Sequence, residues 1–172
     1  ALSTTITGEQ CTAVGYEALK LNTGHFNCAL GFQALETNST GTNKTAVGTN
    51  AMDVSTTGSY NSALGSSALG ANTTGHSNVA VGKDAGVSNT TGSNNTLVGK
   101  DAGYHMSTGG NNTCLGHDAG STSSPSGQIT TGSDTICLGD DSVNDLFCAD
   151  TSISSSDARD KTDVERFTHG LS

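Results

Sequence analysis

The sequence TTGHSNVAVGKDAG at residues 73–86 is followed 17 residues later by TTGSNNTLVGKDAG at residues 90–103. In both copies an opening glycine precedes a closing glycine by 7 residues, and this pair of glycines occurs eight times along the chain. Successive closing glycines are 16, 17, 17, 17, 17, 17 and 23 residues apart. Such a fixed period predicts a solenoid of stacked coils. The opening glycines are Gly8, Gly24, Gly41, Gly58, Gly75, Gly92, Gly109 and Gly132, and the closing ones are Gly15, Gly31, Gly48, Gly65, Gly82, Gly99, Gly116 and Gly139.

Small and aliphatic residues keep fixed places around each closing glycine. An aliphatic residue directly precedes it, a small residue stands one place further back, and alanine follows three places later in seven of the eight copies. Short apolar segments between glycine corners favour strands over capped helices. We therefore expect an all-β fold, a parallel β-roll or β-helix whose 17-residue coils hold two short strands each. Because the core of small inward side chains would be thin, we also expect other chains to cover the coils in a homotrimer.

The composition limits the classes of protein and partner. The 172 residues include 23 glycines, no tryptophan and only 32% hydrophobic residues, which leaves intrinsic disorder as an alternative. The fixed register of the apolar positions argues against disorder. A net charge of −9 without a basic run disfavours nucleic acid as a partner. No apolar stretch approaches the roughly 20 residues of a membrane helix, so we expect no membrane insertion.

The cysteines fit the repeat better than a redox or zinc motif. Cys114 and Cys137 occupy the small position that is alanine in most copies, and Cys28 occupies the place before it. Buried thiols in alanine-sized holes are therefore the favoured interpretation, with a disulfide or a metal site as the alternative. Reduced thiols suit assembly in a cytosol. The other two cysteines are Cys11 and Cys148.

Asparagines recur four residues before and seven residues after the closing glycines, where stacked amides can hydrogen-bond along a solenoid. Glycosylation is the alternative, because six asparagines lie in Asn-x-Ser/Thr sequons. In a chain rich in Asn and Thr such sequons arise by chance. The six are Asn38, Asn43, Asn72, Asn89, Asn94 and Asn111.

Aspartates follow the closing glycines by two places in the later copies, at Asp84, Asp101, Asp118 and Asp141. Stacked carboxylates could bind calcium. The favoured interpretation is a solvated edge neutralised by Lys83, Lys100 and His117, so we expect no metal site and no cofactor. An ice-binding threonine face is disfavoured, since the Thr-Thr pairs lie at glycine turns.

The pattern changes after Gly116. The last interval holds six extra residues that include Pro125, which predicts a surface loop and a candidate contact site at Ser121, Ser123, Pro125 and Gln128. The repeats end at Gly139. Three segments follow from this pattern: a solenoid at 1–139, a stalk and junction at 140–156, and a further module from 157 to 172.

The junction carries a motif of its own, Ser156-Asp157-x-Arg159-x-Lys161, followed by Asp163-Val164. It resembles the junction before the self-cleaving intramolecular chaperone of endosialidase-type phage tailspikes and tail fibres. The resemblance implies that Ser156 is the nucleophile and Lys161 the general base, and that the chain is cut between Ser156 and Asp157. Asp157–Ser172 would then be the truncated start of that chaperone, which in this family trimerises and helps the fibre to fold.

The repeats have a second resemblance. Asn-x-Ala-Val-Gly-x-x-Ala with a glycine turn is similar to the heads of trimeric autotransporter adhesins, which are parallel β-rolls with repeats nearer 14 residues. Both resemblances imply a trimeric surface structure.

We therefore expect a structural or attachment protein: a trimeric fibre or spike segment of a phage or other virus, assembled in the host cytoplasm and carried on the virion. It would contact a host-surface glycan or receptor, or space one that does. A bacterial surface adhesin is the alternative. A glycan-degrading tailspike would need a carboxylate pair in a groove, whereas Glu9, Glu17, Glu36 and Asp53 stand alone in the sequence. No enzyme activity beyond the single self-cleavage is expected.

Overall fold

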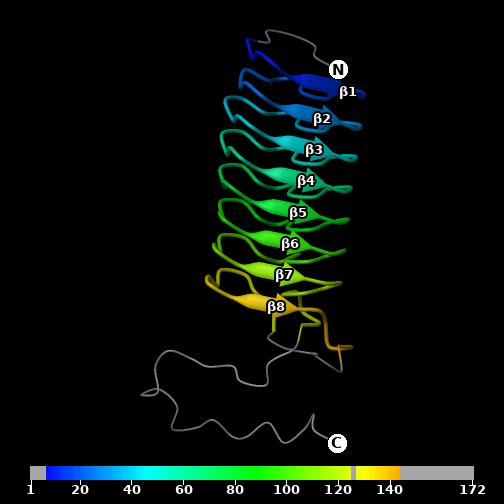
Figure 1. Ribbon diagram of the computed structural model, residues 1–172, viewed down its shortest axis with the longest axis vertical. Helices are drawn as coiled ribbons and strands as arrows, with labels where there is room; N and C mark the ends of the chain where they lie inside the picture. The colour runs from blue at the N-terminus through cyan, green and yellow to red at the C-terminus, as the bar shows by residue number, and fades with distance from the viewer. Residues whose placement is uncertain (1–6, 125–126, 144–172) are drawn as a thin grey trace, which may run out of the picture. The chain divides into compact units, whose positions relative to one another are not determined.

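The computed structural model describes residues 7–124 and 127–143, which belong almost wholly to one compact unit, Ala1–Asp141. This unit is a β-solenoid (Figure 1). Its eight strands lie in one parallel sheet in chain order, one strand to a coil, and we number the coils by their strands. The strands are β1 (Thr12–Val14), β2 (Cys28–Leu30), β3 (Thr45–Val47), β4 (Ser62–Leu64), β5 (Val79–Val81), β6 (Thr96–Val98), β7 (Thr113–Leu115) and β8 (Ile136–Leu138).

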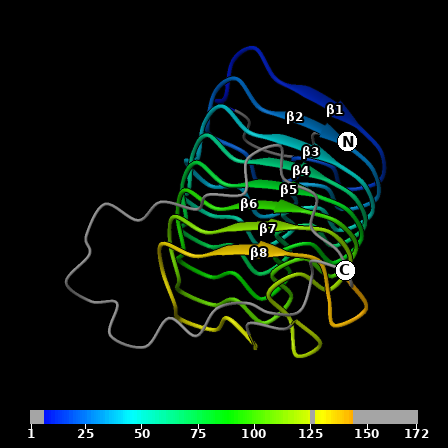
Figure 2. The ribbon, with the colours of Figure 1, turned by 60° about the horizontal axis from the view of Figure 1, so that its bottom comes forward.

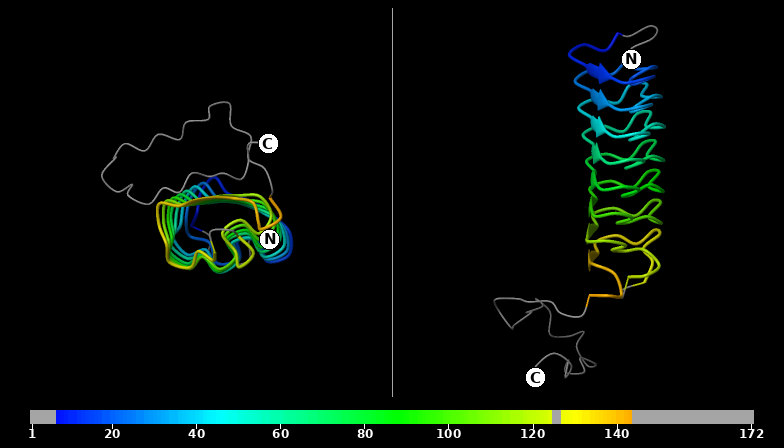
Figure 3. Two further views of the ribbon diagram at one scale, coloured as in Figure 1. Left: turned by 90° about the horizontal axis from the view of Figure 1, so that it is seen from below. Right: turned by 90° about the vertical axis from the view of Figure 1, so that its right-hand side faces the viewer.

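The stack keeps one register throughout the sheet. Ala13 pairs with Ala29, Ala29 with Ala46 and Ala46 with Ala63, so equivalent residues lie directly above one another. Seen along its axis, the unit is a closed outline with the sheet on one side and turns on the others (Figure 3). The predicted parallel solenoid of 17-residue coils is therefore confirmed.

The prediction of two strands per coil is wrong. Each described coil has a single three-residue strand, and the segment after the closing glycine is a turn. Its second and fourth residues have left-handed backbone conformations, as at Glu17 (φ 54°) and Leu19 (φ 51°) in coil 1. Two left-handed residues with one residue between them turn the chain sharply and prevent a second strand.

The closing glycines form a column that no other residue could replace without rearrangement. Gly82 has φ 133°, and a Cβ built on it would lie 2.4 Å from the carbonyl oxygen of Gly99 in the next coil. Gly99 meets Gly116 in the same way, at 2.3 Å. The close approach of successive coils therefore explains why this position is glycine in the first six copies, from Gly15 to Gly99.

The core is a set of small residues, as predicted. The central residue of each strand from β2 to β8 is buried, as is the alanine three places after each closing glycine from Ala18 to Ala119. Cys114 and Cys137 are free thiols in neighbouring coils of this core, and burial raises the pKa of Cys114 to about 12. Their predicted role as small core residues is confirmed.

The position within the coil that carries the larger core side chain differs between the first and the second half of the stack. In coils 1 to 4 they stand four places after the closing glycine, at Leu19, Leu35, Met52 and Leu69. In coils 5 and 6 that place is Gly86 and Gly103, and Leu97 replaces alanine at the centre of β6. A Cβ on Gly86 would lie 2.6 Å from Leu97 Cδ1, and one on Gly103 would lie 2.8 Å from Leu97 Cδ2. Leu97 therefore fills the space that the glycines leave.

Buried asparagines hydrogen-bond from coil to coil. Asn61 Oδ1 accepts a bond from the Asn78 N–H at 2.9 Å, while Asn61 Nδ2 donates to the Gly75 carbonyl at 2.7 Å. The same pair of bonds links Asn78 to coil 6 and Asn95 to coil 7. Each amide thus satisfies backbone groups of the next coil, as the predicted ladder requires.

Candidate functional site

The outer face of the sheet runs through all eight described coils. Within each strand the first and third residues point away from the core, and neither is buried in any of the eight. The strands follow one another along one side of the stack (Figure 2). We call these sixteen positions the sheet face. Its first column is Thr12, Cys28, Thr45, Ser62, Val79, Thr96, Thr113 and Ile136, and its second is Val14, Leu30, Val47, Leu64, Val81, Val98, Leu115 and Leu138.

The sheet face carries no charged side chain, and its second column is apolar throughout, whereas its first column is mostly Thr and Ser. The second column is aliphatic in all eight coils, and Leu64 is 52% and Leu138 42% exposed. None of the sixteen residues is ionised at neutral pH, although the chain contains 16 acids and 7 lysines and arginines. With neighbouring strands about 4.8 Å apart, eight strands make a strip roughly 34 Å long and two side chains wide. Contiguous exposed apolar surface of this kind marks an interaction site.

An aromatic pair lies directly beyond the glycine corners at the N-terminal end. The rings of Tyr16 and Phe32 stack with centroids 5.3 Å apart and planes 13° apart. Tyr16 is 64% and Phe32 47% exposed. The ladder continues here, because the Gln33 N–H donates to the Tyr16 carbonyl at 2.8 Å. The pair therefore follows Val14 and Leu30 of the sheet face by two residues in each coil.

The predicted aspartate column exists only in part. Asp84, Asp101 and Asp118 occupy equivalent places, since their N–H groups donate to Ser66, Lys83 and Lys100 in the preceding coils. The Asp141 N–H donates instead to Ser123 at 2.6 Å, so Asp141 does not continue the column. Lys83 pairs with Asp84 and Lys100 with Asp101. The predicted neutralisation by the two lysines is therefore confirmed.

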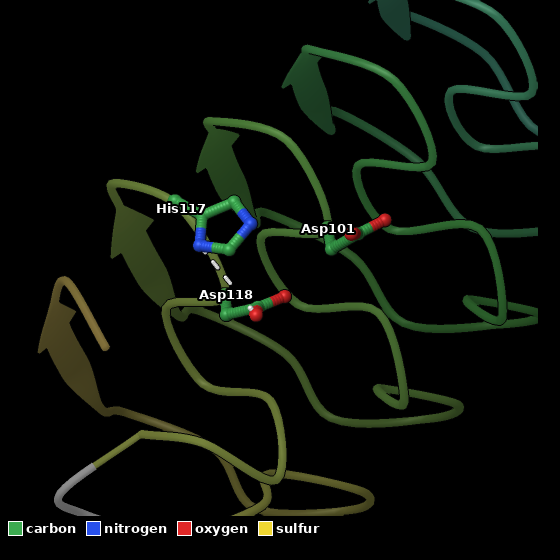
Figure 4. A group of neighbouring side chains, drawn as sticks. All are labelled: Asp101, His117 and Asp118. Carbon is green, nitrogen blue, oxygen red and sulfur yellow. Dashed lines mark ion pairs between the residues drawn. The ribbon is translucent and has the colours of Figure 1, made fainter. Parts of the chain in front are cut away.

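The C-terminal end of this column differs from the rest. There His117 replaces the lysine, and its Nδ1 lies 3.5 Å from Asp118 Oδ2 and 3.1 Å from Asp140 Oδ2. Figure 4 shows the imidazole of His117 above the Asp118 carboxylate, with Asp101 on the neighbouring coil. Ligand atoms of Asp101, His117 and Asp118 all lie within 4.8 Å of one another. The sequence predicted His117 only as a residue that neutralises the aspartates, and it did not predict a role for Asp140.

The residues of the candidate contact loop differ in their exposure to solvent. Gln128 is exposed and Ser123 partly exposed, but Ser121 is buried and Pro125 lies outside the described residues. Ile129 is 7% exposed and belongs to the core, with its N–H donating to Gly120 at 3.0 Å. The extra residues thus return to the stack at Ile129, and among the described residues of the loop Thr122, Gly127 and Gln128 are exposed.

Among the remaining sequence candidates, the sequon residues Asn43, Asn94 and Asn111 are exposed, and so is Glu9. Three sequon asparagines, Asn38, Asn72 and Asn89, are fully buried, which excludes glycosylation of the folded coils there. Glu17 and Glu36 both pair with Lys20, at 2.7 and 3.2 Å, and the hydrogen bond from Lys20 lowers the pKa of Glu17. These two carboxylates are therefore joined through one lysine.

Asp53 lines a shallow open hollow with Asn50, Gly70 and Val87. Burial raises the pKa of its carboxyl group. Asp53 is the one carboxylate among the residues lining this hollow. Glycoside hydrolysis uses two, so the hollow lacks the carboxylate pair that a glycan-degrading enzyme would need.

Lys44 is an internal feature that sequence reasoning missed. It takes the place of the ladder asparagine in coil 3 and is 1% exposed. Its Nζ donates to Asn38 Oδ1 and to Ser55 Oγ, both at 2.7 Å. Burial lowers its pKa to about 7. Ser55 stands where four other coils have asparagine, and the smaller residue makes room for the lysine.

The proposed cleavage residues Ser156, Asp157 and Lys161 lie outside the described residues, as does Cys148. Within the part of the chain that is described, there is no helix long and apolar enough to cross a membrane. Comparison with protein-family models, with curated proteins and with solved structures finds no match. The proposals below therefore depend on the residues and geometry of this chain.

Proposed function

We propose that this chain is a segment of a trimeric fibre or spike of a phage or other virus, in which three sheet faces pack around a common axis. The observation that supports this proposal is the sheet face, which has no charged residue and keeps one aliphatic column over eight coils of a chain with a net charge of −9. A free monomer would expose this strip to water along its whole length.

The shape and energetics of the strip suit assembly of identical chains. Because it is only two side chains wide, three strips can meet at one axis without leaving a large gap. Each coil presents the same two columns, so equivalent coils of three parallel chains would lie at the same height. Burying the exposed half of each aliphatic side chain contributes about 1 kcal/mol. Because each of the eight coils in each of the three chains contributes such a side chain, the whole strip contributes far more free energy of association than one coil binding a small partner could.

The C-terminal junction supplies a second line of support for the viral assignment. Ser156, Asp157, Arg159 and Lys161 match the self-cleavage motif of phage fibre chaperones by position. A hydroxyl nucleophile needs a neighbouring base, and a desolvated lysine can serve as one. Parallel β-trimers have many contacts between distant residues and fold slowly. A folding helper that is later released would therefore be useful at the end of such a fibre.

The test is the mass of the native assembly by light scattering, on the wild-type chain and on two variants. Leu64→Glu places a charge in the middle of the sheet face, and Thr74→Glu places the same charge on an exposed residue outside the strands. We expect a mass near three times 17.2 kDa for the wild type and for Thr74→Glu, and a monomer for Leu64→Glu.

A wild-type chain that remains a folded monomer would refute the trimer, and a mass near twice 17.2 kDa would replace it with a dimer. Equal assembly of the two variants would show that the sheet face is not the interface. The bacterial adhesin remains the alternative. The gene that encodes this chain distinguishes the two, because an adhesin requires a membrane-anchoring barrel downstream and the fibre requires a chaperone.

A further inference from the structure

The residue that directly follows the closing glycine changes charge along the last four coils. It is Lys83, Lys100, His117 and then Asp140. In coils 5 and 6 the lysine neutralises the adjacent aspartate by an ion pair. In coil 7 a histidine takes the place of the lysine beside Asp118, and in coil 8 an acid takes that place. Negative charge therefore collects at the C-terminal end of an otherwise balanced edge.

Three side chains at this end, Asp101, His117 and Asp118, lie close together across coils 6 and 7, and Asp140 of coil 8 contacts His117. His117 Nδ1 lies 3.1 Å from a carboxylate oxygen of Asp140 in coil 8 and 3.5 Å from one of Asp118. Ligand atoms of Asp101 in coil 6, His117 and Asp118 lie within 4.8 Å of one another (Figure 4). The side chains of Asp118 and Asp140 are 23% and 19% exposed, while that of His117 is 53% exposed. The two carboxylates are thus mostly buried, while the imidazole is accessible to solvent.

We propose that Asp101, His117, Asp118 and Asp140 bind a divalent transition-metal ion, with Zn²⁺ as the ion of best fit. An imidazole nitrogen with carboxylate oxygens is a donor set for zinc and its neighbours, whereas calcium takes oxygen ligands alone. Two ligands at about 2.1 Å from one ion lie at most about 4.2 Å apart. The ligand atoms of Asp101, His117 and Asp118 are up to 4.8 Å apart, so these partly exposed side chains would have to rotate slightly to bind one ion. Lys100 then gives up its pairing with Asp101.

Bound metal would act as a clamp between coils. The last interval between closing glycines is 23 residues, against 17 for the five before it, so coil 8 joins the stack through the longest connection. An ion held by Asp101, His117 and Asp140 would tie coil 8 to coils 6 and 7 outside the sheet. Because all the ligands belong to one chain, the site requires neither the trimer nor the proposed viral function.

A simple ion pair of protonated His117 with the two aspartates is the competing explanation. It needs no metal and would be strongest at low pH, when the histidine is charged. Metal binding has the opposite dependence, because the imidazole must lose its proton before it can act as a ligand. The two explanations therefore predict different effects of zinc at pH 7.5.

The experiment is equilibrium dialysis of the untagged full chain against ZnCl₂ at pH 7.5, with bound zinc measured by mass spectrometry. The variants are His117→Gln and Asp118→Asn. Their matched controls are His76→Gln, an exposed histidine two coils before His117, and Asp84→Asn, which occupies the same place as Asp118 with the same left-handed backbone (φ 56° against 54°). A thermal melt with and without zinc gives a second measurement that does not depend on dialysis.

We expect one zinc ion per chain and a higher melting temperature with zinc for the wild type and for both controls. His117→Gln and Asp118→Asn should weaken binding by at least about 10–100-fold, which is the loss that even outer-shell partners of metal ligands cause. They should also abolish the stabilisation by zinc. Absence of binding to the wild type would overturn the proposal, as would equal losses in the site variants and their controls.

Discussion

The exchange of core volume around Leu97 allows a sharp test of how the coils pack. Leu97→Ala removes a fully buried isobutyl group and should cost about 2–5 kcal/mol in the free energy of unfolding. Gly86→Leu alone places a Cβ 2.6 Å from Leu97 Cδ1 and 3.1 Å from Leu69 Cδ2. Overpacking should then cost about 1–3 kcal/mol, and the backbone at φ +60° adds about 1–2 kcal/mol for a residue that is not glycine.

The double variant Leu97→Ala/Gly86→Leu should be more stable than the sum of the two single losses predicts. It recreates the arrangement of coil 4, where Leu69 has φ 52° and the strand centres beside it are Ala63 and Ala80. Neighbours that share one space couple by about 0.5–3 kcal/mol, and we expect a favourable coupling in this range. The assay is urea denaturation followed by circular dichroism, with hydrogen exchange at β6 because solenoids do not always unfold in one step.

The control is Leu97→Ala/Gly120→Leu. A Cβ on Gly120 meets Cys114 and Ile129, not Leu97, so these two changes should add independently. If the Gly86 double variant is also additive, Leu97 does not compensate for the missing leucine, and the explanation of the glycines in coils 5 and 6 is wrong.

Three further outcomes are expected. Ala80→Phe should overpack the thin core and prevent assembly, whereas Ser77→Phe should be tolerated at an exposed place where two other coils carry Phe or Tyr; equal tolerance, measured by soluble yield and mass, would contradict the register. Because burial lowers the pKa of Lys44 to about 7 from 10.5, the unfolded chain binds the extra proton between these values, and stability should rise with pH across this window by up to about 1.4 kcal/mol per unit. Lys44→Met should remove that part of the slope in pH-dependent denaturation, and an unchanged slope would show that the lysine is charged when folded. In a chain extended with a complete chaperone, Ser156→Ala and Lys161→Ala should each leave the precursor uncut on a gel, and cleavage in either would exclude the proposed pair.

The sequence was sufficient for the solenoid because its period is encoded in contacts between equivalent residues. A glycine whose absent Cβ would lie 2.4 Å from the next coil must recur in every coil, and so must an alanine that fits a narrow core. The inward position of Ala80 and Ala85 follows from the same constraint. These features could be predicted without knowing how the chain turns between them.

The turn itself was mispredicted, although a signal was present. The place two residues after the closing glycine is Asn or Asp in five of the eight copies, and Asn and Asp are the residues that tolerate left-handed backbone best. Asn50, Asp84, Asp101 and Asp118 have this backbone. At the fourth place, however, Leu19 and its equivalents have φ near 50°. Leucine gives no such signal, because it does not favour left-handed backbone. Only the burial of its side chain in the core offsets the free-energy cost of that conformation.

The site at His117 was missed for a different reason. The alignment of Lys83, Lys100, His117 and Asp140 is visible in the sequence, but the last of them follows an interval of 23 residues. Only the structure shows that coil 8 returns close enough for Asp140 to lie 3.1 Å from His117. It also shows that Asp141, which the repeat predicts for the column, turns toward Ser123.

The positions of the charged residues are compatible with the proposed trimer despite the high net charge of each chain. Three parallel chains would bring three charges of −9 into one particle, and repulsion between them opposes assembly. Charges kept off the sheet face remain in water, where they are screened beyond about 8 Å at physiological salt. The apolar strip would then be buried without desolvating any charged group. A single acid among the sixteen outward positions would place three like charges together at the axis, which is a physical reason for none of the eight coils to contain one.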